Sequence, residues 1–221
     1  MSTALEADPV VAAPAVSRKP QQGRSKASLE RMLAAAEQLM IERGCEDFTL
    51  QEVSQRGNVS IGSIYLRFDS KDNLVRAVIS DHLERMKEEE DRMLAVVTES
   101  ASLNSFVAAY VEAYAELLKQ HAPLLRLTMK RAENDPQVSE PGKRVALRVE
   151  DLSTAAMMAY ADEMGGKDKE LKANSSFHVI FATLARQLSL GSTGESVHDY
   201  DWSQLKRELG RMCLAYLKHA R

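Results

Sequence analysis

The sequence is poor in the residues that build disulfide frameworks, sheets and membrane spans. Its 221 residues include 2 cysteines, 10 glycines and only 5% aromatic residues. Two cysteines without CxxC spacing exclude a disulfide framework, so Cys45 and Cys213 are predicted to be reduced structural thiols. The longest apolar run covers seven residues, Ala155 to Ala161, whereas a helix that spans a bilayer needs roughly 20. The N-terminal stretch also lacks the pattern of a secretory signal, so we expect a cytoplasmic protein.

The motifs of common enzymes and metal sites are missing as well. The five histidines show neither HExxH nor HxH spacing, and no GxSxG, Walker or GxGxxG motif occurs. We therefore expect no enzyme activity, no metal and no cofactor. Two alternatives stay open: an α-helical enzyme or small-molecule-binding protein with purely structural N-terminal helices, and a helical scaffold for protein partners. Steep salt dependence of duplex binding would separate a DNA-binding protein from both.

Positive charge is local rather than global. The net charge is −3, which argues against a protein coated in nucleic acid. Between Ser17 and Arg31, however, five cations face Glu30 alone; they are Arg18, Lys19, Arg24, Lys26 and Arg31. Such a cationic arm is typical of a segment that contacts phosphates, although a solvated disordered tail would have the same composition.

Helical periodicity dominates the rest of the chain, and no segment shows sustained strand alternation. Residues 1–24 lack periodicity and are expected to be disordered. Apolar spacing predicts one helix from Ser28 to the stop signal at Gly44, two short helices from Leu50 and from Ser60, and a long helix from Ser70 to Val97. Proline and glycine punctuation then predicts helices at about 102–121, 123–134, 142–164, 168–190 and 201–220. The predicted fold class is all-α.

The two short helices have the signals of a helix-turn-helix unit. Thr49 and Glu52 form a capping box at the start of the first one, and Ser60 can cap the second. The pair Gly57-Asn58 between them suits a tight turn. In such a unit the second helix enters the major groove.

The second helix is predicted to pack one face into the core and to present the other face to DNA. Ile64 and Phe68 turn inward, and the small residues at its start let the helix approach base edges. Tyr65 is expected to cover the edge of the core while its hydroxyl reaches a phosphate. The expected DNA contacts are Arg24, Lys26, Thr49, Ser60, Ile61, Gly62, Ser63, Tyr65, Arg67 and Lys71.

Several short motifs follow one another between residues 25 and 78. They are Leu33-Ala34-Ala35-Ala36, Arg43-Gly44, Phe48-Thr49, the run from Val59 to Phe68, and Ser70-Lys71-Asp72-Asn73-Leu74. Together they resemble the DNA-binding domain of TetR-family bacterial transcriptional regulators. The resemblance covers about a quarter of the chain.

The resemblance implies a division of labour along the chain. Residues 1–24 would be a disordered arm with a basic end, 25–70 the three-helix DNA-binding domain, and 71–221 a larger helical domain for effector binding and dimerisation. It further implies a homodimeric repressor that binds double-stranded operator DNA at a pseudo-palindrome and is released by a small-molecule effector. The helix that begins at Ser70 is expected to be the only long element joining the two parts.

Two positions depart from the family pattern. The family usually has Ala-Gly in the turn, where this chain has Gly57-Asn58. Asn58 is expected to adopt the left-handed conformation, and the missing methyl at Gly57 to loosen the packing between the two helices. Ile61 stands where a polar or basic residue is usual, which predicts an altered operator preference.

Apolar residues beyond residue 100 are candidates for two roles. The last two helices carry wide apolar stripes that predict a two-fold four-helix dimer interface; they comprise Leu171, Phe177, Ile180, Phe181, Leu184, Leu188, Trp202, Leu205, Leu209, Met212, Cys213, Tyr216 and Leu217. An effector pocket between helices would be apolar with a few polar anchors. Its candidates are Phe106, Tyr110, Tyr114, His121, Arg126, Met129, Met157, Met158, Tyr160, Phe177 and Phe181. Plain core packing would give the same spacing.

Overall fold

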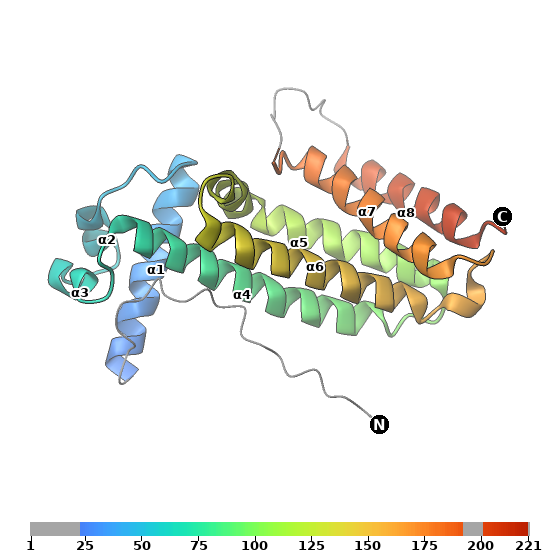
Figure 1. Cartoon of the computed structure of the whole chain (residues 1–221), viewed down its shortest axis with the longest axis horizontal. Helices are drawn as coiled ribbons and strands as arrows, with labels where there is room; N and C mark the ends of the chain where they lie inside the picture. Colours follow the sequence, from blue (N-terminus) through green and yellow to red (C-terminus); the bar gives the residue numbers. More distant parts are fainter. Residues whose placement is uncertain (1–22, 192–200, 221) are drawn as a thin grey trace. The chain divides into compact units, whose positions relative to one another are not determined.

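The computed structural model of the chain describes residues 23–191 and 201–220. Helices make up the described part, with no strand among these residues, as the sequence predicts. None of the described helices is long and apolar enough to cross a bilayer. The elements are α1 (Gly23–Arg43), α2 (Leu50–Arg56), α3 (Ile61–Tyr65), α4 (Lys71–Val97), α5 (Leu103–Ala132), α6 (Pro136–Met158), the 3₁₀ turn η1 (Ala161–Glu163), α7 (Lys169–Gln187) and α8 (Trp202–Lys218) (Figure 1).

The helices form two compact units. The first, here called the head, contains the described residues up to 84 together with 131–145. The second, the body, contains 85–130 and the described residues from 146 onward. The head thus contains more than the predicted DNA-binding domain of residues 25–70, and α4, α5 and α6 each contribute residues to both units. Three helices therefore join the head to the body.

The head is built around α2, which packs against both α1 and α3 (Figure 1). Met32, Ala36 and Met40 recur every four residues along α1 and are completely buried, which is the spacing that places side chains on one helix face. The helix stops at Gly44, whose φ of 63° lies in the left-handed region that glycine enters without steric cost. The fully buried side chains of Ile64 and Phe68 complete this core, as predicted.

The first helix begins earlier than predicted, at Gly23 rather than Ser28. The side chain of Arg67 donates hydrogen bonds to the carbonyl and the Oγ of Ser25, at 2.7 and 2.6 Å. These bonds fix the first turn of α1 from a residue more than forty positions away. Local periodicity could not reveal them. Most of the segment predicted to be a disordered arm, residues 1–22, lies outside the described residues.

Two prolines that were predicted to separate helices lie inside them. Pro123 sits within the continuous α5, and Pro141 within α6, which begins at Pro136 rather than at 142. A proline in a helix costs about 3 kcal/mol, but buried residues on both sides of Pro123 pack α5 along its length. The start of α6 follows the cap rules, because Asp135 accepts a hydrogen bond from the amide of Gln137 at 3.1 Å and Pro136 needs no amide partner.

The body packs around one face of α5. Phe106, Tyr110 and Tyr114 recur every four residues and are almost completely buried. Helices α7 and α8 run side by side and antiparallel (Figure 1), since the amide of Gly165, just before α7, bonds the carbonyl of Leu217 at the end of α8, at 3.0 Å. Cys213 lies buried in this core, and burial raises the pKa of its thiol to about 11. A protonated thiol in such a place suits the predicted structural role.

Candidate functional site

The turn of the helix-turn-helix unit confirms the prediction for Asn58 and corrects the one for Gly57. Asn58 takes the left-handed conformation, with φ 46°, whereas Gly57 is right-handed, with φ −79°. A Cβ on Gly57 would lie 3.0 Å from the carbonyl oxygens of Arg31 and Val53. The expectation of loosened packing is therefore wrong, because glycine here allows α2 to approach α1 more closely than a methyl would.

The predicted capping box at Thr49 is confirmed. The Thr49 hydroxyl accepts from the Glu52 amide at 3.2 Å, and the Glu52 carboxylate accepts from the Thr49 amide at 2.8 Å. A hydrogen bond from Arg43 is the largest of the influences that lower the pKa of Glu52 to about 2. The Thr49 hydroxyl thus serves the helix start, and its predicted contact with DNA stays a prediction.

Helix α3 presents a small, polar and uncharged face. Ser60 caps it by accepting from the Ser63 amide at 3.1 Å, and the two hydroxyls lie 2.7 Å apart. Ser60 and Gly62 are exposed, Ile61 and Ser63 are half-buried, and no neighbour lies within 4 Å of a Cβ on Gly62. Tyr65 was predicted to cover the edge of the core with its ring, but it is 59% exposed. Ile64 and Phe68 close the core instead. This leaves the ring free to meet a partner.

The predicted cationic contacts fall into two groups. Lys71 donates to the carbonyl of Glu46 at 2.9 Å and lies 5.3 Å from the ring centre of Phe48, while Arg67 is bonded to Ser25. Lys26 is exposed on α1. Arg24 belongs to the first turn of α1, and its side chain lies outside the described residues. Lys71 and Arg67 therefore have structural partners that any contact with phosphate must share or replace.

An ion-pair network within the head was missed by sequence reasoning. Asp135 accepts from Arg76 at 2.8 Å and from Arg131 at 2.9 Å. Arg131 also bonds Asp72 and Glu46. Burial opposes ionisation of Asp135, but the hydrogen bonds from the two arginines hold the pKa of its carboxyl below the usual value. The network thereby ties residues 131–135 to the start of α4 and to the segment before α2.

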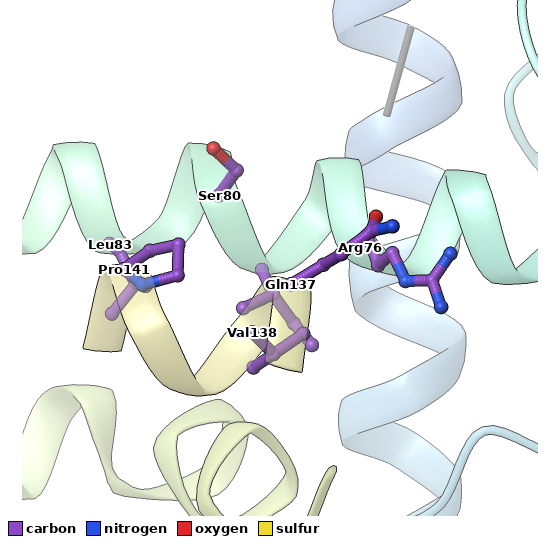
Figure 2. A pocket seen from close by; sticks show the side chains of 7 residues that line it. Arg76, Ser80, Leu83, Gln137, Val138 and Pro141 are labelled. Atoms are coloured by element: carbon purple, nitrogen blue, oxygen red, sulfur yellow. The ribbon is translucent and has the colours of Figure 1, made fainter. Parts of the chain in front are cut away.

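The first turns of α6 pack closely on α4 next to this network. Figure 2 shows the small crevice between them, lined by Arg76, Ile79, Ser80 and Leu83 of α4 and by Gln137, Val138 and Pro141 of α6. Its volume of about 10 Å³ is roughly the space of one water molecule. The crevice is too small for an effector.

The aromatic effector candidates form one chain of ring contacts within the body. Ring centres lie 5.7 Å apart for Phe106 and Tyr110, 5.5 Å for Tyr110 and Tyr114, and 6.2 Å for Tyr114 and Phe177. Tyr160 joins at Phe106 and Phe181 at Phe177. Met157 is buried in the same core and Met158 packs against it. We call these rings the aromatic cluster.

Three other candidates lie apart from the aromatic cluster or have partners of their own. Met129 packs on a smaller group formed by Ala122, Ala185 and Leu190. His121 is buried, and its Nε2 lies 3.0 Å from the Glu89 carboxylate. Arg126 is exposed and donates to the carbonyl of Leu188 at 2.9 Å, so the structure does not place it as an anchor in the core.

A buried acid in the body was also missed. Glu90 on α4 is 1% exposed, and burial raises the pKa of its carboxyl to about 8. The signal was present in the sequence, because Glu90 lies four residues after Met86 and four before Leu94, both in the core. An acid on the apolar face of a helix should have been singled out.

Comparison with known proteins locates the DNA-binding region. Residues 32–78 match the family described as bacterial regulatory proteins, tetR family. An uncharacterized HTH-type transcriptional regulator of Bacillus subtilis, YvkB, is 38% identical over 53 residues, or 24% of this chain. That match spans only 28% of the relative's own length.

Solved structures extend the likeness to the whole fold. A putative TetR-family transcriptional regulator from Mesorhizobium loti has a TM-score of 0.70 at 16% identity, covering 89% of this chain and 98% of its own. FadR of Bacillus subtilis, solved in complex with stearoyl-CoA, has a TM-score of 0.61 at 16% identity, covering 85% and 98%. Residues 32–78 are therefore a TetR-family DNA-binding region, and the chain that carries them has the fold of the TetR-family transcriptional regulators.

Proposed function

We propose that the chain is a ligand-responsive transcriptional repressor. It binds a pseudo-palindromic operator as a homodimer and leaves it when a small molecule enters the body. The observation that carries the proposal is the small, polar face of α3, held in a helix-turn-helix unit that matches a family of regulatory proteins.

The head supports a direct role in reading DNA. The start of α3 presents Ser60, Gly62 and Ser63 without large side chains, so the helix backbone can approach base edges in the major groove. Ile61 can contact a thymine methyl group, and the exposed ring of Tyr65 can carry its hydroxyl to a phosphate. In this assignment Ile61, Gly62 and Ser63 select the sequence and Tyr65 positions the protein.

The outer face of α7 and α8 supports dimerisation. About half of the predicted stripes belong to the core of the chain itself, since Ile180, Leu184 and Leu209 are almost completely buried. Leu171, Met212 and Tyr216 of the predicted stripes instead project outward, as does Val179, each at least 44% exposed. A second copy packed across these two helices would bury them in a four-helix bundle.

The link between effector and operator runs through three helices. The head holds residues 131–145 of α5 and α6 through the ion pairs of Arg131 and Asp135. The chain continues from this segment into the body on both sides, and α4 provides a third continuous connection. A ligand that displaces body residues of α4, α5 or α6 can therefore shift the head, with a coupling of about 1–3 kcal/mol for a typical allosteric protein.

Selection of tight binders from a random-sequence duplex pool tests the proposal. We expect the selected sequences to contain an inverted repeat with half-sites one helical turn or somewhat more apart. Footprinting should then show both half-sites protected by a dimer of twice 24.6 kDa. Selection of no sequence over random DNA, or equal affinity for an isolated half-site, would contradict the proposal.

A further inference from the structure

Glu90 occupies a position where the fold calls for an apolar side chain. Along the body part of α4, Met86, Glu90, Leu94 and Val97 follow one another at spacings of four, four and three residues. The other three belong to the body core, each at most 8% exposed. The carboxyl of Glu90, 1% exposed, lies in the middle of this stripe.

Neither oxygen of this carboxyl has a hydrogen-bond partner among the described residues. The charge of Arg148 on α6 acts on Glu90, but the guanidinium binds Asp91, and its Nη1 is also buried without a partner. The hydroxyl of Tyr110 is committed to Ser153, at 2.8 Å. Native cores pair nearly all their buried polar groups, so the unpaired carboxyl of Glu90 points to an absent partner.

The surroundings of Glu90 select the chemistry of that partner. The Glu90 charge adds to the burial that raises the pKa values of Tyr110 and Tyr114 on α5, so both residues lie within its field. Their rings stack with centres 5.5 Å apart within the aromatic cluster. Aromatic faces attract organic cations, and a desolvated carboxylate does so more strongly. An anionic ligand would meet repulsion from the ionised form of Glu90, and the Arg148 guanidinium, whose charge also acts on Glu90, already binds Asp91.

We propose that the body binds an apolar organic cation, such as an aryl ammonium compound, whose charge pairs with Glu90 and whose rings pack into the aromatic cluster. This inference rests on the proposed function only for its regulatory meaning, because the cation site is a property of the body itself. It names the effector class that the proposed function leaves open.

Proton release gives the site a distinctive signature. With a pKa near 8 the free carboxyl is mostly neutral at pH 7, and pairing with a permanent cation requires its ionised form. Binding should therefore release close to one proton at pH 7, and affinity should rise about tenfold between pH 6 and pH 7. The other groups that act on Glu90 are Asp91 on α4 and Arg148 on α6, while Tyr110 and Tyr114 on α5 feel its charge.

The probe pair is phenyltrimethylammonium and its uncharged isostere tert-butylbenzene, which differ only in nitrogen against carbon. Calorimetry on the full chain in two buffers of different ionisation enthalpy measures affinity and protons released. We expect the cation to bind at least tenfold more tightly than the isostere, and Glu90→Gln to remove that preference. Glu88→Gln, at an exposed position two residues earlier on α4, is the matched control and should retain it.

The opposite results are equally definite. Equal binding of both probes, or unchanged cation affinity in Glu90→Gln, would overturn the proposal. If Glu90→Gln does not fold, the wild-type protein labelled with ¹³C in its glutamates suffices, because the Glu90 titration midpoint must fall when phenyltrimethylammonium is added. A midpoint that stays near 8 would overturn the proposal.

The operator assay then separates this inference from the proposed function. Cation binding without any operator binding would overturn the repressor role and leave the site standing. Operator binding that no cation affects would overturn the effector role of the site, whereas release by the cation from wild type but not from Glu90→Gln would support both.

Discussion

Two buried carboxyls distinguish the head from the body. Asp135 in the head accepts from Arg76, Arg131 and a backbone amide, and these partners hold its pKa below the usual value. Glu90 in the body has no such partner, and burial raises its pKa to about 8. The two carboxyls therefore have opposite effects on stability. The paired carboxyl of Asp135 stabilises one arrangement of its helices, whereas the unpaired carboxyl of Glu90 destabilises the folded chain until a ligand pairs with it.

The pH dependence of stability should show the largest effect. The pKa of Glu90 is raised in the folded state from 4.5 to about 8, so the folded chain holds a proton that the unfolded chain loses across this range. Its contribution to stability is therefore greatest below pH 4.5 and falls as the pH rises to 8, by on the order of 5 kcal/mol. Urea unfolding of wild type and Glu90→Gln from pH 5.5 to 8.5 measures this contribution as the difference between their slopes of unfolding free energy against pH. If the two slopes are equal, the Glu90 carboxyl does not destabilise the folded chain at high pH, and the contrast with Asp135 is lost.

Glu90→Leu should stabilise the protein, because it restores the apolar stripe between Met86 and Leu94. The gain should grow with pH, reaching several kcal/mol near pH 8. Removal of the buried carboxyl should at the same time abolish the preference for a cationic ligand. A less stable Glu90→Leu would show that the carboxyl has a stabilising role.

Removing the paired carboxyl of Asp135 should destabilise the protein, in contrast to Glu90→Leu. Asp135→Asn removes the anion that pairs with Arg76 and one of the three anions that pair with Arg131, and we expect a loss of about 3 kcal/mol in the free energy of unfolding. Glu140→Gln is a suitable control, since its ion pair with Lys143 lies on the exposed surface. Thermal unfolding compares the variants, and equal losses would show that the network contributes no more than a surface pair.

Close packing in the head predicts a smaller loss. Gly57→Val should cost about 2 kcal/mol, because its side chain would press on the carbonyl oxygens of Arg31 and Val53. A Cβ at Gly62 would meet no atom within 4 Å, so Gly62→Val should leave stability nearly unchanged. It should instead weaken operator binding, because it blocks close approach to the bases. If the two variants unfold alike, the close approach at Gly57 carries no energetic weight.

The smallest expected effect concerns Lys71. If its ammonium contacts one phosphate as well as the Glu46 carbonyl, Lys71→Ala should weaken specific and random DNA alike and lower the salt slope by about 0.9. Titration at four salt concentrations measures the slope, with Lys87→Ala in the body as the control. An unchanged slope would assign Lys71 to holding the Phe48 segment alone.

Sequence reasoning predicted what depends on neighbours along the chain. The Thr49 and Glu52 capping box, the Ser60 cap and the inward side chains of Ile64 and Phe68 were all predicted correctly, since each needs only local spacing. Pro123 was taken for a break because its local cost is evident, whereas the packing that compensates it comes from other helices.

Long-range pairing was beyond that reasoning. Arg76 and Asp135 are 59 residues apart, and nothing in either neighbourhood indicates the other. The aromatic candidates do come together, yet core packing alone would also unite them, so their role in binding an effector stays a prediction. Glu90 did offer a local signal, an acid at a core spacing, and that signal was overlooked.

The head is assembled from two separate stretches of sequence, and this bears on its use as an exchangeable part. A chimaera that joined residues 1–84 to the body of another regulator would leave behind Arg131 and Asp135, the partners of Glu46, Asp72 and Arg76. A transplant that carries residues 131–145 as well would keep those ion pairs. Recombination in nature faces the same constraint: one crossover cannot move the head intact, so new combinations of head and body properties are more readily reached by substitutions within each unit.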